Sequence, residues 1–225
     1  MVALNPDSRK EVGSVRVLLR LSLSPGWGPA RIREGLERTG SVDGLMHSAA
    51  RRGSLAPWSR VDEVLNRCRA AGVATTALDA PRYPTGLMHL PDPPPVLFTR
   101  GDVDTLLQPR VVIVGSRRAT AYGRRAAWVL AALAARSGWL VVSGMALGID
   151  GAAHRGALEA GGSSVAVLGS GPDRPTPRAH LSLAERLREQ GCLVSELPPT
   201  TPARPHHFPR RNRILAALGS CVVVV

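Results

Sequence analysis

The sequence predicts an α/β protein in which a small helical domain precedes a doubly wound, mainly parallel sheet. In residues 109–225, short apolar runs alternate with amphipathic stretches, the pattern of strands joined by crossover helices. In residues 1–75 the pattern is mostly helical. A proline-rich linker, residues 76–108, leads from the first region into the sheet and contains the stiff stretch DPPPVLF.

The helical domain should contain at least three helices, at residues 14–23, 30–40 and 61–72, and the last two stop at a glycine. The stretch SPGWGP, Ser24–Pro29, makes a tight turn between the first two. A helix, a P-G-x-G turn and a second helix are typical of a helix-hairpin-helix or SAM-like domain, whose turn amides can face a DNA backbone. An ordinary helical hairpin would show the same glycines, so both interpretations stay open.

The second region should form an extended Rossmann-like sheet. Its expected strands are Val111–Val114, Trp139–Val142, Ser164–Leu168, Cys192–Val194 and Cys221–Val225. The expected helices are Gly123–Ser137, Asp150–Ala160, Ala179–Gln190 and Arg210–Leu218. Right-handed crossovers between parallel strands place ligands outside the carboxyl ends of the strands. The residues that follow each strand are therefore the candidate site residues.

Charge favours a polyanionic partner. The chain of 225 residues has 29 Lys+Arg and 17 Asp+Glu, a net charge of +12, and Lys10 is its single lysine. Residues 109–225 hold 15 arginines against 6 acidic residues, a net charge of +9. Arginine pairs with phosphate in a planar, two-pronged geometry and stacks on bases. An arginine-rich genome would explain arginine over lysine, but not the scarcity of acidic residues in this half.

Composition also narrows the class of protein. The longest apolar runs are far too short to span a bilayer, and the start MVALNPDSRK lacks a signal core, so no membrane association and a cytoplasmic location are expected. Three cysteines lie far apart with no CxxC pair, which favours reduced, buried thiols over a metal site or a disulfide.

The first candidate segment is GSRRAT, which follows the first strand of the sheet. Gly115 permits a sharp turn, Ser116 offers a hydroxyl group, and Arg117 and Arg118 add positive charge before a helix begins. The amides at a helix start bind anions. A dinucleotide site would instead require G-x-G-x-x-G, which is absent, so no cofactor is expected.

The second segment is SGMALGIDGAAH. Gly144 and Gly148 allow a close approach of the backbone to a ligand. Asp150 and His154 are spaced as a metal or acid–base pair would be, but no third ligand stands nearby in sequence. We therefore expect Asp150 to cap the helix and to orient His154, with no metal bound.

Two later segments complete the expected binding edge. The loop GSGPDRPTPRAH supplies Gly169, Gly171 and Arg178, and the segment HHFPRRNRILAAL begins a helix with arginines at its amino end. That placement is electrostatically unfavourable unless an anion is bound. Phe208 beside arginines could stack on unpaired bases or could be a core residue. The candidate residues on this helix are Phe208, Arg211, Asn212 and Arg213.

These segments, in this order, closely resemble the bacterial DNA-processing protein A family (DprA, also called Smf). The resemblance rests on GSR…YG, SGMALGIDGAAH, AVLGSG and SELPP…HFPRRNRILAAL, within residues 110–225. It implies a non-enzymatic protein that binds and protects single-stranded DNA entering during natural transformation and loads the RecA recombinase for recombination. The family's phosphate pocket maps onto Gly115, Ser116, Arg117, the 144–150 loop, Arg211 and Arg213.

The chain departs from the family's pattern in two places. The Tyr-Pro-x-x-Asn pattern is TPRAH here, with Thr176 and His180 in place of the tyrosine and the asparagine; Arg178 stands where a basic residue is common. The chain also stops at Val225, where members of the family continue into further sheet elements and a dimer-forming region. The homodimer and the RecA contact are therefore expected of full-length members.

The alternative function is enzymatic. Lysine-decarboxylase-like proteins, which cleave nucleoside monophosphates, share this glycine-rich strand–helix style but need a P-G-G-x-G-T-x-x-E segment. This chain has none, and Glu196 is its only acidic residue close after a strand end. The sequence therefore predicts no catalytic residues and favours DNA binding over nucleotide cleavage.

Overall fold

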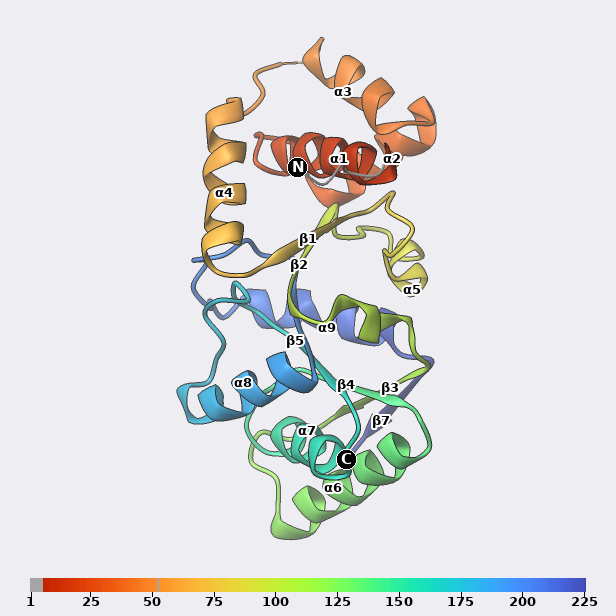
Figure 1. The fold of residues 1–225 in the computed structure, drawn as a ribbon, viewed down its shortest axis with the longest axis vertical. Coiled ribbons are helices and arrows are strands. Elements are labelled where there is room, and N and C mark those ends of the chain that lie inside the picture. Colours follow the sequence, from red (N-terminus) through yellow and green to blue (C-terminus); the bar gives the residue numbers. More distant parts are fainter. Residues whose placement is uncertain (1–5, 52) are drawn as a thin grey trace.

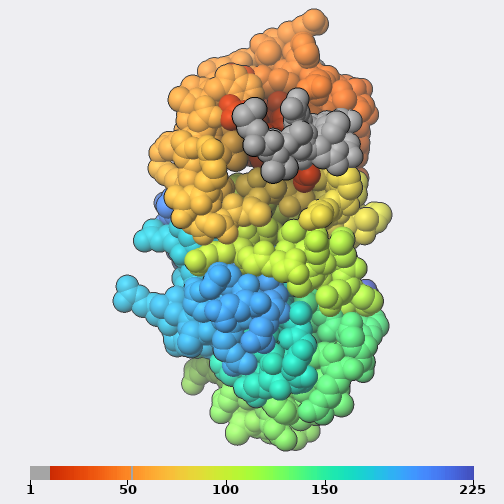
Figure 2. Space-filling view, viewed as in Figure 1, coloured from red at the N-terminus to blue at the C-terminus, as the bar shows by residue number. Residues whose placement is uncertain are grey.

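The computed structural model describes residues 6–51 and 53–225 and confirms the predicted α/β fold class. The described part of the chain forms a helical region at one end and a sheet region at the other (Figures 1 and 2). The helices of the first region are α1 (Pro6–Ser22), α2 (Pro29–Thr39), α3 (Val42–Ala50) and α4 (Trp58–Ala70). Helix α3, which the sequence analysis did not predict, is capped by Ser41, whose Oγ accepts from the Gly44 amide at 3.0 Å.

The sheet combines a parallel core with an antiparallel edge. Its strand order is β1-β2-β6-β5-β4-β3-β7, and the five strands from β6 to β7 run parallel. These five are β3 (Arg110–Val114), β4 (Leu140–Ser143), β5 (Ser164–Val167), β6 (Gly191–Ser195) and β7 (Cys221–Val224). All five lie within two residues of their predicted ranges. The alternating apolar pattern was therefore sufficient to locate them.

The predicted linker contributes to the sheet. Strand β2 (Val96–Gly101) pairs antiparallel with β6, from Phe98 opposite Ser195 to Gly101 opposite Cys192. Strand β1 (Ala74–Ala77) pairs with the outer edge of β2. The short helices α5 (Thr85–Met88) and η1 (Val103–Leu107) flank β2 in sequence. The segment that joins the two regions thus forms the antiparallel edge of the sheet.

Helices cover both faces of the parallel strands. Helices α6 (Ala121–Arg136), α7 (Ile149–Glu159) and α8 (Leu181–Gln190) pack side by side, whereas α9 (His207–Leu218) packs across β3, β4 and β5. Val111 and Ile113 of β3 belong to the core under α6 and α7, and Val112 belongs to the core that contains α9. This alternation is the two-residue period of a strand buried on both faces.

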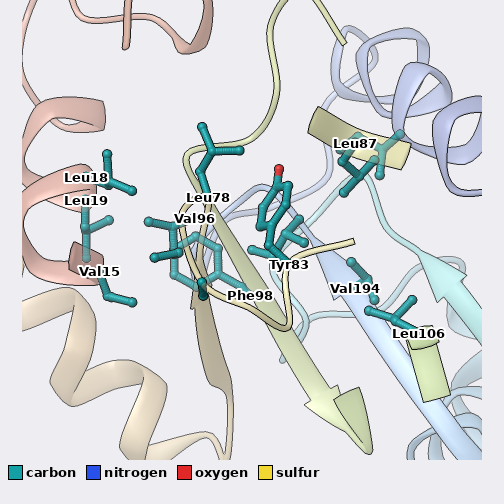
Figure 3. Packing of buried hydrophobic residues seen from close by; sticks show 14 of the residues in the cluster. Val15, Leu18, Leu19, Leu78, Tyr83, Leu87, Val96, Phe98, Leu106 and Val194 are labelled. Carbon is teal, nitrogen blue, oxygen red and sulfur yellow. The ribbon is translucent and has the colours of Figure 1, made fainter. Parts of the chain in front are cut away.

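The core under α9 continues into the helical region. Figure 3 shows Leu18 and Leu19 of α1 on the side of β2 where Val96 and Phe98 lie. Tyr83 and Leu87 extend the same cluster toward α9, and the Tyr83 hydroxyl donates to the Pro94 carbonyl at 2.8 Å. The helical region therefore packs on the antiparallel edge and leaves the carboxyl ends of β3, β4 and β5 to the loops that follow them.

The strand order reverses at β3. The crossovers through α6, α7 and α8 lead from β3 toward β6, and the crossover through α9 returns to β7 on the other side of β3. In open α/β sheets the loops that diverge from such a reversal leave a crevice at the carboxyl ends of the strands. The segment GSRRAT follows β3 and therefore lies at this crevice.

Candidate nucleic-acid interface

The turn after β3 is tightly held and presents two arginines to solvent. A side chain at Gly115 would collide with the Val225 carbonyl and with Ile149. The Ser116 hydroxyl accepts from the Arg118 amide at 3.1 Å, and the Thr120 hydroxyl caps α6 by accepting from the Gly123 amide at 3.0 Å. Arg117 and Arg118 are both exposed, as the sequence predicts for this turn.

The loop after β4 is fastened to that turn. Gly148 has φ 80°, and a side chain there would collide with the Ser116 carbonyl. The same carbonyl accepts from the Ile149 amide at 3.2 Å. Met145 is fully buried with φ 58°, which is uncommon for a residue with a side chain. The turn and the loop therefore form one rigid edge, and Gly148 is required there by its backbone conformation.

Asp150 does not have the predicted role. Its Oδ2 accepts from the amides of Gly144 at 3.1 Å and Ala146 at 3.3 Å, so the carboxylate holds the preceding loop rather than capping α7, whose N-cap is Gly148. Burial raises the pKa of Asp150, and these amide donors oppose the rise. The prediction of a helix cap was wrong because the carboxylate accepts from the amides of the preceding loop instead of from the first turn of α7.

His154 is also placed differently from the prediction. It is fully buried, and its Nδ1 lies 2.7 Å from Ser164 Oγ, not from Asp150. The Ser164 hydroxyl donates to the Val141 carbonyl at 2.7 Å, so it must accept a hydrogen bond from the Nδ1–H group of His154. Burial lowers the pKa of His154 to about 3. A neutral imidazole with one nitrogen occupied and no solvent access is a structural group.

Sequence reasoning missed the role of His180. Its imidazole is 5% exposed and donates from Nδ1 to the carbonyl of the strained Met145 at 3.0 Å. The ring lies against Gly151, where a side chain would come within 2.5 Å of Cε1. The sequence shows His180 as a departure from the family's pattern, in TPRAH. It does not show that His180 bonds to the Met145 carbonyl, 35 residues earlier. His180 and Asp150 together fix the loop after β4.

The loop after β5 supports Phe208. A side chain at Gly169 would lie 3.1 Å from Phe208 Cδ1, and the Gly169 carbonyl lies 3.1 Å from His207 Nδ1. Gly171 is buried and its amide donates to the Thr201 carbonyl at 2.9 Å. Gly169 therefore allows close packing with the first turn of α9, and Gly171 allows close packing with the segment before α9. Arg178 is exposed in η2 (Arg178–His180), and it does not line the cavity described below.

Arg117 and Phe208 form the contact that joins the turn to α9. The guanidinium carbon of Arg117 lies 5.3 Å from the centroid of the Phe208 ring. At this separation the cation is attracted by the face of the ring. Phe208 therefore positions Arg117, whose own side chain remains exposed.

Arg211, a predicted phosphate-binding residue, is buried. It is 4% exposed, and its Nη1 donates to the Gly144 carbonyl at 2.8 Å and to the Val167 carbonyl. A side chain at Gly144 would lie 2.6 Å from both terminal nitrogens, so the glycine makes room for the guanidinium. Burial lowers the pKa of Arg211 to about 10, which leaves it charged at neutral pH. Arg211 thus ties together the carboxyl ends of β4 and β5.

Arg213 lies in a different environment from Arg211. Its Nη2 donates to Glu196 Oε2 at 2.6 Å, and its Nε lies 3.0 Å from Asp92 Oδ2. Arg210 also approaches Glu196, at 3.2 Å. Arg213 and Glu196 therefore form an ion pair that links α9 to the end of β6, and the predicted convergence of Arg213 with Arg117 and Arg211 was wrong.

A cavity of about 360 Å³ lies at the crevice between β3 and β7. Arg117 and Arg211 both contribute to its lining, and Asn212 and Gly115 lie beside them. Asp150, its single acidic lining residue among those described, is engaged by backbone amides. The other lining residues are apolar or small, from β3, α9, β7 and the loop after β4. The cavity therefore combines two cations with an apolar floor, a combination that suits a phosphate joined to an organic group.

A larger cavity of about 750 Å³ lies between the helical region and residues 78–93. Its lining includes four acidic side chains, Glu11, Glu37, Asp43 and Asp79, with Arg33 as the one cation among the described lining residues. A negative lining repels phosphate. The described lining of this cavity therefore disfavours a phosphate ligand.

The described residues contain no group of three or more His, Cys, Asp or Glu side chains that could hold a metal ion. Among the same residues, no helix combines the length and the apolar character that crossing a membrane requires.

Comparison with known proteins places the chain in a family. The family model for DNA recombination-mediator protein A matches residues 74–225. The chain is 38% identical over 169 residues to the DNA processing protein DprA of Bacillus subtilis, covering 75% of this chain and 57% of that protein. It is 43% identical over 148 residues to the protein Smf of Escherichia coli, covering 65% of this chain and 40% of that protein. The chain thus spans about half the length of the curated relatives it matches.

Two solved structures share the fold. The X-ray structure of DprA from Streptococcus pneumoniae aligns with a TM-score of 0.70 and 26% identity, covering 96% of this chain and 74% of that one. A structure of DprA from Helicobacter pylori, described for its single-stranded DNA binding mode, aligns with a TM-score of 0.62 and 29% identity, covering 68% of each chain. The family match covers residues 74–225, which include every element of the candidate site, and the chain therefore belongs to the DNA recombination-mediator protein A family.

Proposed function

We propose that this protein binds single-stranded DNA with little base preference, in the cytoplasm, and acts on DNA taken up during natural transformation. In this proposal it protects the incoming strand and delivers it to the RecA recombinase without catalysing a reaction of its own. The observation that carries the proposal is the cavity at the carboxyl ends of the strands, which Arg117 and Arg211 both line and whose described lining contains no free carboxylate. The binding mode described for the Helicobacter pylori relative supports the same ligand class.

Electrostatics favour a strand over a single small phosphate. Arg117 and Arg118 are exposed, and within the described residues neither has a carboxylate within ion-pair distance. Each phosphate that a free arginine neutralises releases counterions and adds affinity that depends on salt. Two adjacent cations and the amide end of α6 can contact successive phosphates of one strand, whereas a mononucleotide offers one group.

The acidic and basic groups of this edge do not support nucleotide cleavage. Glu196 is 7% exposed and is held by Arg210 and Arg213. Asp150 is bound by backbone amides, and His154 is fully buried. A general base must reach the proton that it abstracts, and none of these three does so. Free base released from a nucleoside monophosphate by the purified protein would revive the enzymatic alternative.

The direct test is the salt dependence of DNA binding, measured by fluorescence anisotropy with oligo-dT and with duplex of equal length. We expect tighter binding to oligo-dT and a linear fall of log affinity with log salt. Replacing Arg117 with alanine should weaken binding about 5- to 150-fold, as expected for a charge-assisted hydrogen bond of about 1–3 kcal/mol, and should reduce the salt slope by about one unit.

The matched control is Arg33→Ala in the helical region. Arg33 pairs with Glu37 at 2.8 Å and donates to the Leu90 carbonyl, so its charge is already used within the protein. We expect its replacement to change DNA affinity less than about 2-fold. Tighter binding to duplex, indifference to salt, or equal losses from Arg33→Ala and Arg117→Ala would each contradict the proposed site.

A further inference from the structure

One aromatic side chain beside the arginine turn has no structural role in the protein. Tyr122 is 85% exposed, the largest fraction among the exposed large hydrophobic side chains of the described residues. It lies in the first turn of α6, two residues after the N-cap Thr120. Tyr83, by contrast, is 3% exposed and its hydroxyl is bonded.

Tyr122 lies on the same surface as the turn after β3, as the close packing around Gly123 and Gly148 indicates. A side chain at Gly123, the next residue, would lie 3.5 Å from Ile149 Cδ1, so the first turn of α6 packs against the start of α7. Gly148, which precedes Ile149, lies against the carbonyls of Ser116 and Arg117. The turn, the loop and the first turn of α6 are therefore contiguous. Five residues link Arg117 to Tyr122, a separation of at most about 18 Å.

Phe208, the aromatic residue that the sequence suggested for base stacking, is already engaged. The Arg117 guanidinium carbon lies 5.3 Å from its ring centroid, and Gly169 packs against Cδ1 and Cε1. A base could stack on this ring only by displacing Arg117. Tyr122 has no cation–π or ring–ring contact with any described residue, so its ring is available.

Positive charge flanks the available ring. Arg118 is exposed just before α6. Arg125 is exposed one turn after Tyr122 on the same helix face, and its guanidinium carbon lies 4.8 Å from the centroid of the Trp128 ring. The first turn of α6 contains no acidic residue. Aromatic rings set between cations are the arrangement by which proteins bind single strands, because bases stack while phosphates are neutralised on either side.

We propose that Tyr122 is a base-stacking residue: a nucleobase of the single strand whose phosphate is held at Arg117 stacks on the Tyr122 ring. This inference rests on the proposed function and assigns a base contact to a surface that otherwise provides phosphate contacts alone. It also accounts for an apolar ring that is 85% exposed to solvent.

The test compares two ligands and three variants. Anisotropy titrations use oligo-dT and an abasic oligonucleotide of the same length, which keeps the phosphates and lacks the bases. Tyr122→Ala should weaken oligo-dT binding about 5- to 150-fold, since stacking contributes about 1–3 kcal/mol per base. The salt slope should not change because no charge is removed. Tyr122→Phe keeps the ring and should bind oligo-dT like the wild type.

Leu133→Ala is the matched control, because Leu133 is a 54% exposed apolar residue on α6 three turns from Tyr122; this variant should bind like the wild type. On the abasic strand, wild type and Tyr122→Ala should bind equally. An equal loss on both ligands, or wild-type binding of oligo-dT by Tyr122→Ala while Arg117→Ala is impaired, refutes stacking and leaves the proposed function intact. A wild-type protein that binds neither strand refutes the proposed function, and the stacking role with it.

Discussion

Replacing Arg211 with alanine should destabilise the fold as well as weaken DNA binding. Arg211 is 4% exposed, and its guanidinium donates to the carbonyl of Gly144, which directly follows β4, and to that of Val167, the last residue of β5. Alanine would leave both carbonyls without their donor and would open a cavity beneath Gly144. A buried acceptor that loses its partner is costly because water cannot replace the donor.

The magnitude follows from these two contacts. A hydrogen bond to a charged group contributes about 1.5–3 kcal/mol, so the loss of two would cost about 3–6 kcal/mol. The burial that lowers the pKa of Arg211 to about 10 opposes part of this loss, because alanine removes a desolvated charge. We therefore expect a net loss of about 3 kcal/mol. For a chain of this size that corresponds to a melting temperature about 6–12 °C lower.

The assay is thermal unfolding by circular dichroism, with oligo-dT binding measured below the transition. Arg117→Ala is the control, since its exposed side chain should affect affinity and leave the melting temperature within about 1 °C. If Arg211→Ala melted like the wild type, the guanidinium would not join the ends of β4 and β5, and the structural role assigned to it would be wrong.

Two further predictions concern buried ionisable groups. The neutral His154 has a pKa lowered to about 3, whereas the unfolded chain protonates it near 6.5, so wild-type stability should fall by about 1.3 kcal/mol from pH 7.5 to pH 5.5. His154→Asn, whose amide can donate to Ser164, should lose this part of the pH dependence in urea unfolding; an unchanged dependence would contradict the assignment. Glu196→Gln should lower stability by about 1–3 kcal/mol, because the partner of Arg213 loses its charge, and should change oligo-dT affinity less than about 2-fold. A tenfold loss of affinity would show instead that Glu196 acts in the DNA site.

The parallel strands could be predicted because their signal is local. Each is a short apolar run, and the residue types that follow, such as Gly115 and Gly148, are those required by tight turns and positive φ. Strand β1 and helix α3 were not predicted. For β1 the reason is physical. The stretch ATTA, Ala74–Ala77, has neither the length nor the apolar character of an independent strand, and it is stabilised by pairing with β2.

The hydrogen-bond and ion-pair partners of the arginines on α9 could not be predicted from composition. Helical spacing, however, predicts that Arg211 and Arg213 face different sides of the helix. Arg211 and Arg213 are two residues apart, and side chains at i and i+2 do not face the same side of a helix. Arg211 shares its face with Ile214, Leu215 and Leu218, all of which are buried. The 3.6-residue period of α9 therefore places Arg211 against the sheet. The identity of its acceptors, 44 and 67 residues away in sequence, depends on the tertiary fold.

The charge available to DNA is therefore smaller than the net charge of residues 109–225 implies. Arg211 is committed to strand-end carbonyls, and Arg210 and Arg213 are committed to Glu196, so α9 contributes scaffolding more than free cations. Its Phe208 in turn positions Arg117. Arg210 and Arg213 contribute little to counterion release because Glu196 already neutralises part of their charge, and Arg211 is buried. The salt slope of DNA binding should accordingly report the arginines of the turn and of α6, and the helix that looked most basic in sequence should affect it least.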